Sequence, residues 1–330
     1  MKWRVVGLLL VLAMSGLGVR AQSEGRVRQY MYTQQDFNPA YAGSQGLMNV
    51  MVMGRQQWVG FGQGAPQLLF LNVDVPFNYR TAATMTPGLK MQYSHGLGLS
   101  ACRDAAGYGS RIVAELSYAG RFHLRGKGSL SLGVGISVMN DRYEATWRAV
   151  DGAEGDPAVP SARQSAINFD VSFGLYYNTP RLYFGVSGRN LLGHGLREKL
   201  TPTKVKVLDA YGSVREFYVV AGYDARLPRR WALQPSALIR TNLKEHQLTL
   251  TLTTSYNDLV WFGVNYSLLE SVGGLLSFNV LHGLRIGYQY DYPTSALGRY
   301  TSGSHEVVLG YSFSLKREKV TRQYKTVRYL

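Results

Sequence analysis

Hydrophobic and polar residues alternate one by one along much of the chain, most regularly from about residue 95 onward. In residues 130–138 (LSLGVGISV) aliphatic side chains alternate with serine and glycine. Residues 167–177 (INFDVSFGLYY) and 248–253 (LTLTLT) repeat this period of two. Because successive side chains of a β-strand point to opposite faces, the pattern predicts strands that each have one apolar face.

Fourteen segments fit this pattern, and single-chain bacterial outer-membrane barrels also have an even number of strands. Many are close to the ~9–11 residues that a tilted strand needs to cross a bilayer. The predicted strands are residues 47–55, 68–76, 94–102, 111–123, 128–140, 167–178, 181–191, 214–226, 230–241, 246–256, 259–268, 271–281, 283–292 and 304–314.

Soluble β-sandwiches also alternate, so two further features favour a membrane barrel. Connections after the even-numbered segments are mostly tight and those after odd-numbered segments are often long, with residues 77–93 as the exception. Aromatic residues recur near the predicted strand ends, as in the aromatic girdles of membrane barrels. They include Tyr177, Tyr183, Trp231, Trp261, Tyr288, Tyr290 and Tyr292. We therefore predict an all-β, transmembrane antiparallel outer-membrane β-barrel of about 14 strands, with its short turns and both termini in the periplasm.

The stretch before the first predicted strand, residues 22–46, forms a separate unit in our division of the chain. The predicted inner face of the barrel is small and polar and lacks the charged rings of a wide, water-filled pore, which predicts a narrow or plugged lumen. Residues 22–46 are the candidate for a plug or a periplasmic arm, and a loose N-terminal tail is the alternative. The barrel is expected over residues 47–315 and a basic C-terminal periplasmic tail over residues 316–330.

Residues 1–21 have the features of a secretory signal peptide. Lys2 and Arg4 form a basic start, residues 5–14 are apolar, and Val19-Arg20-Ala21 places small residues at the cleavage positions. The apolar run is too short to span a membrane, so we expect the mature chain to begin at Gln22. An exported multi-pass barrel is expected in the outer membrane, in contact with the lipid bilayer.

Composition and charge narrow the functional classes. The 330 residues include 37 glycines and 23 tyrosines but only 17% charged residues, and no internal window reaches the ~18 apolar residues of a membrane-spanning helix. The formal charge of +15 is scattered and comes with no nucleic-acid-binding motif, so no nucleic acid is expected as a partner. Positive charge is concentrated only in residues 316–330, which have a net charge of +5. This tail is either a solvated extension or a contact with a periplasmic partner.

The sequence offers little catalytic or metal-binding chemistry. The six histidines form no metal-ligand pair, and neither a Gly-x-Ser-x-Gly elbow nor a phosphate-binding loop is present. The single cysteine, Cys102, permits no internal disulfide. Asp151, Glu154 and Asp156 offer oxygen ligands for Ca²⁺, but a solvated acidic loop is the favoured interpretation. We expect no catalytic residues, no cofactor and no metal, and hence no enzyme.

Two motifs at the ends of the predicted barrel carry a resemblance to a known family. The first is DFNPAYAGS at residues 36–44, followed by RQQWVGF at 55–61 and GAP at 64–66; the last is GSHEVVLGY at 303–311. With the strand-turn-strand patterns between them, they resemble the PorP/SprF family, outer-membrane proteins of the type IX secretion system of the Bacteroidota. The resemblance extends in order over nearly the whole mature chain.

The motif residues also have a physical interpretation. Pro39 keeps Asn38 out of the helical region and Gly43-Ser44 ends a turn, which predicts a fixed bend before the first strand. Trp58 and Phe61 fall in the first long loop, where their rings can cap the barrel mouth or meet a partner, and capping is the favoured interpretation. The candidate interaction residues are Asn38, Pro39, Ala40, Tyr41, Ala42, Gly43, Ser44, Arg55, Gln57, Trp58, Gly60, Phe61, Gly64, Ala65, Pro66, Gly303, Ser304, His305 and Glu306.

The resemblance implies a non-catalytic barrel of the type IX secretion and gliding-motility machinery. Such a barrel either works with periplasmic, peptidoglycan-linked components or holds one secreted cargo protein through its C-terminal domain. We expect this chain to anchor or escort a cargo at the outer membrane. An outer-membrane channel or small-solute transporter is the alternative that the barrel alone supports, and a surface enzyme is a third that rests only on export.

Overall fold

The computed structural model describes residues 27–77, 92–107, 109–124, 128–144, 163–193, 214–281 and 283–314. Four expectations fall outside these residues and stay predictions. They concern the signal peptide with its cleavage site before Gln22, the acidic loop with Asp151, Glu154 and Asp156, most of the connection 77–93, and the basic tail 316–330.

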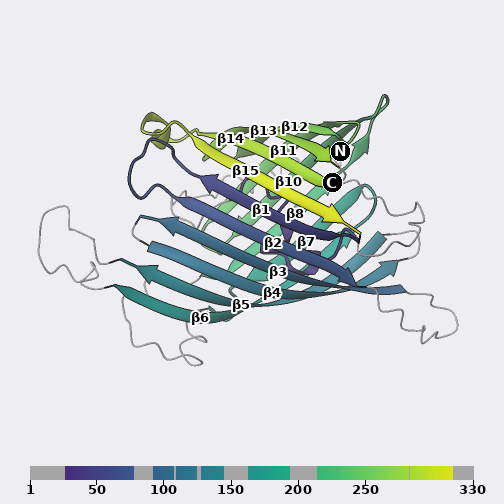
Figure 1. The fold of residues 1–330 in the computed structure, drawn as a ribbon, viewed down its shortest axis with the longest axis horizontal. Helices are drawn as coiled ribbons and strands as arrows, with labels where there is room; N and C mark the ends of the chain where they lie inside the picture. Colours follow the sequence, from purple (N-terminus) through teal and green to yellow (C-terminus); the bar gives the residue numbers. More distant parts are fainter. Residues whose placement is uncertain are drawn as a thin grey trace, which may run out of the picture.

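The described strands form one antiparallel sheet that closes on itself (Figure 1). They are β1 (Met48–Gln56), β2 (Gln67–Phe77), β3 (Gln92–Ala106), β4 (Gly109–Leu124), β5 (Gly128–Tyr143), β6 (Gln164–Asn178), β7 (Leu182–Arg189), β8 (Glu216–Tyr223), β9 (Ala225–Arg226), β10 (Trp231–Thr241), β11 (His246–Tyr256), β12 (Val260–Ser267), β13 (Ser271–Leu281), β14 (Leu284–Pro293) and β15 (Ser304–Phe313).

The sheet is a closed barrel of 14 strands. Each strand pairs with its sequence neighbours, and β15 returns to pair with β1 from Met48↔Phe313 to Gln56↔His305. The strands β8 and β9 pair with β10 on either side of Asp224, so they form one interrupted strand of the wall. Each of the fourteen predicted strands has its counterpart in this barrel, and the predicted fold class is confirmed.

Apolar side chains lie on the outer surface of the barrel, which indicates that this surface contacts lipid. Along β5, Ile136 is 64% exposed on the outer surface whereas its neighbour Ser137 is only 4% exposed toward the lumen. The same alternation holds along β6, β11 and β14. A soluble sandwich would bury the apolar face, so this inside-out arrangement is typical of a membrane barrel. No helix among the described residues is both long and apolar enough to cross a membrane.

Two of the predicted girdle residues are placed wrongly by the sequence interpretation. Tyr183 and Trp261 are buried in the lumen, whereas Tyr288, Tyr290 and Tyr292 lie on the outer surface as expected. The reason is the period of two: Tyr183 alternates with the exposed Leu182 and Phe184, and Trp261 precedes the exposed Phe262. The odd or even position of a residue in its strand, and not its aromatic character, decides whether it faces the lumen or the lipid.

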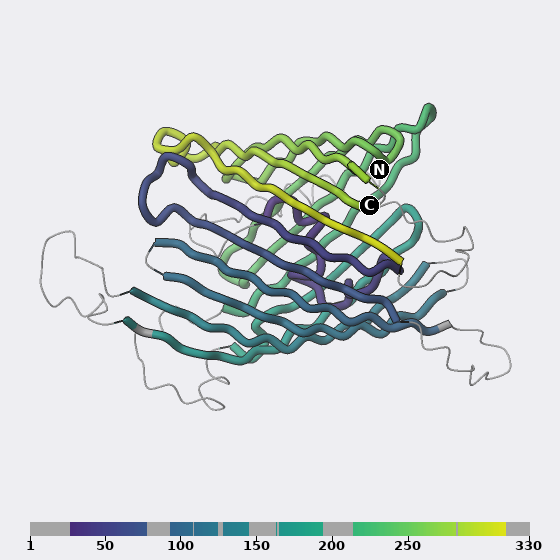
Figure 2. Tube along the Cα trace, in the orientation of Figure 1, coloured from purple at the N-terminus to yellow at the C-terminus, as the bar shows by residue number. Residues whose placement is uncertain are grey.

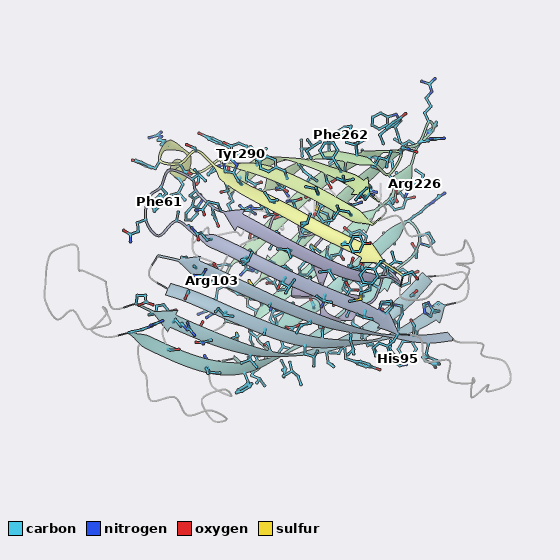
Figure 3. The ribbon with its side chains drawn as sticks, viewed as in Figure 1. Phe61, His95, Arg103, Arg226, Phe262 and Tyr290 are labelled. Atoms are coloured by element: carbon cyan, nitrogen blue, oxygen red, sulfur yellow. The ribbon has the colours of Figure 1, made fainter. Side chains whose placement is uncertain are left out.

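The two rims of the barrel differ. One rim, called the loop end here, carries the connections 57–66 and 294–303, together with shorter ones such as 242–245. The other, called the turn end, carries the tight connections 179–181, 227–230 and 257–259. The first residue of β1 and the last residue of β15 also lie at this end. Figure 3 shows Phe61 and Tyr290 toward the loop end and His95 and Arg226 toward the turn end.

We expect Ile136→Lys to destabilise the membrane-inserted barrel by about 2–4 kcal/mol, because it places a charge on the lipid face in the middle of β5. Leu243→Lys is the control: Leu243 is 71% exposed, but it lies in the connection 242–245 beyond the strands. The unfolding free energy in lipid vesicles, measured by denaturant titration, checks this. Equal losses in both variants would contradict the assigned lipid face.

Candidate functional site: the lumenal segment and the closing strands

Residues 27–46, called the lumenal segment here, lie inside the barrel (Figure 2). Every residue from Arg28 to Gly43 is buried except Asp36, which is half-buried. Hydrogen bonds join the segment to strands on different sides of the wall, for example Arg28 to Ser267 of β12 at 2.5 Å and Asn38 to the Leu175 carbonyl of β6 at 3.0 Å. The segment therefore crosses the lumen instead of lying against one wall.

The local sequence explains how the segment bends. The short helix α2 (Gln34–Phe37) ends before Asn38, whose backbone is extended because proline follows it. Pro39 then begins the 3₁₀ turn η1 (Pro39–Tyr41), and the Asn38 side chain caps it by accepting a hydrogen bond from the Ala40 amide at 3.0 Å. The expected fixed bend is thus two short turns joined at Asn38.

At the loop end a buried carboxylate holds the start of the segment. Glu306 of β15 accepts hydrogen bonds from the backbone amides of Arg28 at 3.0 Å and Gln29 at 2.8 Å. The Arg55 guanidinium of β1 lies 3.1 Å from Glu306 and 2.8 Å from Asp291 of β14. All three side chains are almost completely buried. One guanidinium thus compensates two carboxylates, and one of these also binds the segment.

The middle of the segment packs against strands β4 to β8. Arg189 lies 3.2 Å from Asp36 and 3.7 Å from Glu115 of β4, so it links the segment to the wall. The Ser187 hydroxyl donates to the Phe37 carbonyl at 2.5 Å, and the Phe37 ring stacks on Tyr218 with centroids 5.3 Å apart. Polar and aromatic contacts together fix the α2 turn.

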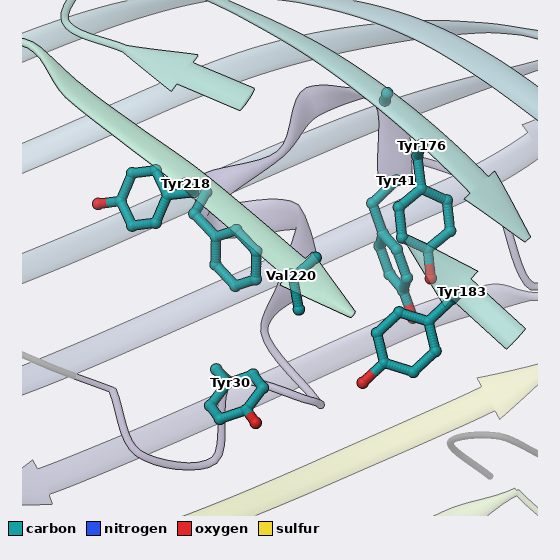
Figure 4. Close-up of a cluster of buried hydrophobic side chains, with 8 residues drawn as sticks. Tyr30, Tyr41, Tyr176, Tyr183, Tyr218 and Val220 are labelled. Carbon is teal, nitrogen blue, oxygen red and sulfur yellow. The ribbon is translucent and has the colours of Figure 1, made fainter. Parts of the chain in front are cut away.

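At the turn end the backbone of the segment is held a second time. Arg121 of β4 donates to the carbonyl oxygens of Ala42 at 3.1 Å and Gly43 at 2.6 Å. The Gly43 amide donates to the Asp74 carboxylate of β2 at 2.9 Å. The Tyr41 ring meets Tyr176 edge-on at 5.3 Å, within the cluster of buried aromatic side chains in Figure 4. The peptide at residues 42–43 is therefore bound through both its donor and its acceptors.

Glycines in the strands leave the room that the segment occupies. A Cβ atom on Gly133 would lie 2.1 Å from the Ala40 nitrogen, one on Gly174 2.0 Å from the Asn38 side-chain oxygen, and one on Gly96 2.1 Å from the Ala42 oxygen. Heavy atoms cannot approach so closely, so any side chain at these positions requires a shift of the segment. Part of the glycine content is thus explained by the space that the segment needs.

The closing pair of strands brings the first and last motifs together. Arg55 pairs with Glu306 in the register of β1 and β15. Beyond them the connections 57–66 and 294–303, together called the loop platform, are joined by hydrogen bonds from Val59 to the Gly303 carbonyl at 2.8 Å and from Ser302 to the Val59 carbonyl at 2.7 Å. On this platform Phe61 is 50% and Tyr300 70% exposed.

Comparison with known proteins adds the family. Residues 19–311 match the family described as "Type IX secretion system membrane protein PorP/SprF". The chain belongs to the PorP/SprF family. No curated protein sequence matches it.

Solved structures resemble the PorP/SprF chain in fold alone. The Ralstonia pickettii toluene transporter TbuX is 10% identical, covers 90% of this chain and 96% of its own, and has a TM-score of 0.48. The Acinetobacter baumannii outer membrane protein Omp33 is 8% identical and has a TM-score of 0.44. The match covers 81% of this chain and 98% of Omp33.

The structure divides the candidate interaction residues of this PorP/SprF protein into three places. Asn38 to Gly43, Arg55 and Glu306 are buried in the lumen, with Ser44 half-buried beside them. Gln57, Gly303 and Ser304 are buried at the base of the loop platform, which holds Trp58, Gly60, Phe61, Gly64, Ala65 and Pro66. His305 faces outward and bonds the Tyr288 hydroxyl at 2.7 Å.

The sequence interpretation missed Asp74, Arg121, Arg189 and Asp291, which contact the segment or the residues that hold it. Asp291 lies in the segment YQYDY at residues 288–292, which belongs to the family resemblance, but it was not singled out as a site residue; the other three are charged residues within strands with no motif around them. The one available signal is the odd or even position of each residue within its strand. Each of the four lies on the small, polar face of its strand, which the structure shows to line the lumen.

We expect Gly133→Ala to destabilise the barrel by about 1–3 kcal/mol, since the added methyl group overlaps the segment at Ala40. Gly120→Ala is the matched control, because a Cβ on Gly120 of β4 meets no atom within 4 Å. The unfolding free energies of the two variants check this. A loss in Gly120→Ala as large as that in Gly133→Ala would contradict the account of the glycines.

Arg55→Met should cost about 3–5 kcal/mol of unfolding free energy, because it leaves Glu306 and Asp291 buried without their cation. Adding Glu306→Gln and Asp291→Asn should restore part of this loss. The control is Arg163→Met, whose partner Glu144 lies 3.4 Å away in an exposed pair and should matter by about 1 kcal/mol or less. An Arg55→Met variant with the unfolding free energy of the wild type would contradict the stabilising role of the contacts between Arg55, Asp291 and Glu306.

Proposed function

We propose that this PorP/SprF protein is a non-catalytic outer-membrane component of type IX secretion that anchors or escorts an exported protein and contacts periplasmic parts of the machinery. In this proposal a cleaved signal peptide over residues 1–21 exports the chain. The family membership supports a role in type IX secretion, and the outward apolar face supports residence in the outer membrane.

One observation supports an anchor over a channel: the lumen is occupied by the protein's own residues 28–43, which are held at both ends. A barrel filled in this way offers its partners its rims and outer surface. A passive channel or small-solute transporter, the alternative, needs a continuous open path that this packing does not favour.

The loop platform is the surface that we propose for the exported partner. Two connections far apart in sequence are fixed to each other there by backbone hydrogen bonds, and Thr301 adds a side-chain bond to the Val59 carbonyl at 3.0 Å. Phe61 and Tyr300 are presented on this ordered support, and exposed aromatic side chains on a rigid base are typical interface hot spots. Partners on the periplasmic side would meet the turn end.

The test uses a strain lacking the gene, complemented with the wild-type protein, with Phe61→Ser/Tyr300→Ser, or with the control Leu243→Ser. Affinity purification of the barrel from detergent-solubilised membranes identifies the exported partner, which is then labelled with antibody on whole cells. We expect loss of surface label in the deletion strain, recovery with wild type and Leu243→Ser, and at least about tenfold less label with the double variant, since truncating hot-spot aromatics costs about 2 kcal/mol or more.

Barrel abundance in the outer membrane and uptake of small solutes are measured in the same strains. Unchanged surface label in the deletion strain overturns the proposal. A deletion that instead reduces solute uptake, with the exported proteins unaffected, supports the channel alternative.

A further inference from the structure

We propose that the barrel lumen is a peptide-binding site, that the lumenal segment is the peptide bound in it, and that release of the segment opens a passage through the barrel. This goes beyond the anchoring role, which concerns the rims. The ligand class is a peptide that carries the Asn-Pro-Ala-Tyr-Ala-Gly turn of residues 38–43.

The wall recognises the segment through its backbone at both ends. Glu306 accepts two consecutive amides at residues 28–29, and Arg121 with Asp74 binds both carbonyls and an amide at residues 42–43. Backbone donors and acceptors are what a site must satisfy to bind a peptide in a place without water. The wall supplies these groups from strands that are distant in sequence.

The wall also selects side chains in the middle of the segment. Asn38 donates to the Leu175 carbonyl at 3.0 Å, and the Phe37 and Tyr41 rings pack on Tyr218 and Tyr176. The wall glycines described above let the turn at Asn38–Ala42 approach the strands. These contacts make the site specific for the motif and not for any extended chain.

The segment is attached so that it can leave without breaking the barrel. Among the described residues, the connection to β1 is the covalent link between the segment and the wall, and Gly43 and Gly46 in this connection have φ of +65° and +75°. Between the two ends, side-chain oxygens of Thr33, Gln34 and Gln35 find no hydrogen-bond partner among the described residues. The middle of the segment is therefore incompletely hydrogen-bonded to the wall, and the connection to β1 contains two glycines in a backbone conformation that other residues rarely adopt.

A passage follows from the size of the barrel. About eight strands give an interior that side chains alone can fill, whereas 16–18 strands leave an aqueous channel. This barrel has 14 strands, and many of its inward positions are glycine, serine or threonine, such as Gly133, Ser131 and Thr251. Without the segment such a wall does not fill its own lumen.

The test keeps the wall intact and weakens the segment in the full chain. Asn38→Ala/Tyr41→Ala removes the motif's main side-chain contacts, and Thr33→Ala is the control, because the Thr33 hydroxyl has no partner among the described residues. Each protein is reconstituted in planar lipid bilayers. We expect wild type and Thr33→Ala to be silent and the double variant to show conductance steps, which a synthetic peptide of residues 27–46 closes.

The same peptide with both substitutions should need at least about tenfold higher concentration to close the steps, since it lacks a hydrogen bond and an aromatic contact. A silent double variant, or conductance that the wild-type peptide leaves unchanged, overturns the proposal.

If the double variant does not fold, Thr33→Cys with Cys102→Ser decides. Labelling of the introduced thiol by a membrane-impermeant maleimide should be slow and should become at least about tenfold faster with excess free peptide, which competes for the site. An unchanged labelling rate overturns the proposal. None of these readouts depends on an exported partner, so they are independent of the anchoring role.

Discussion

The pairing of β15 with β1 is the interaction on which the rest of the structure depends. A sheet edge in hydrocarbon would leave backbone amides and carbonyls without partners, and each unpaired group costs several kcal/mol, so the wall must close. Closure sets the size of the lumen, places Arg55 opposite Glu306, and joins the loops 57–66 and 294–303. Motifs about 250 positions apart in the sequence thereby become one site.

Closure also explains why charged residues are found where a soluble protein would have its apolar core. The outer face is in lipid and must be apolar, so polar side chains collect in the lumen, where many of them bond to one another or to the lumenal segment. Arg55 with Asp291 and Glu306, and Arg189 with Asp36 and Glu115, are held together by this constraint. The segment contributes apolar rings to the same space, so the lumen combines ion pairs with an aromatic cluster.

The sequence was sufficient for the strands and their faces, because a period of two is a local property of each segment. It failed for Tyr183 and Trp261, where aromatic character was given more weight than the odd or even position in the strand. It marked Arg55 and Glu306 as motif residues but not their contact, since that contact depends on barrel closure. The course of the lumenal segment depends on pairs such as Arg121 with Gly43 and Glu306 with Arg28, which lie 78 and 278 positions apart, and no local pattern encodes them.

In mechanical terms, the lumenal segment acts as internal bracing. An empty barrel under a lateral or pulling force deforms in cross-section, whereas contacts that link opposite walls across the lumen resist this deformation. Arg28 connects β12 to the chain that Glu306 of β15 holds, and Arg121 fastens the other end of that chain to β4. These contacts connect β15, beneath the loop platform, through the segment to β12 and β4, so a load applied at the platform is not carried by the two strands beneath it alone.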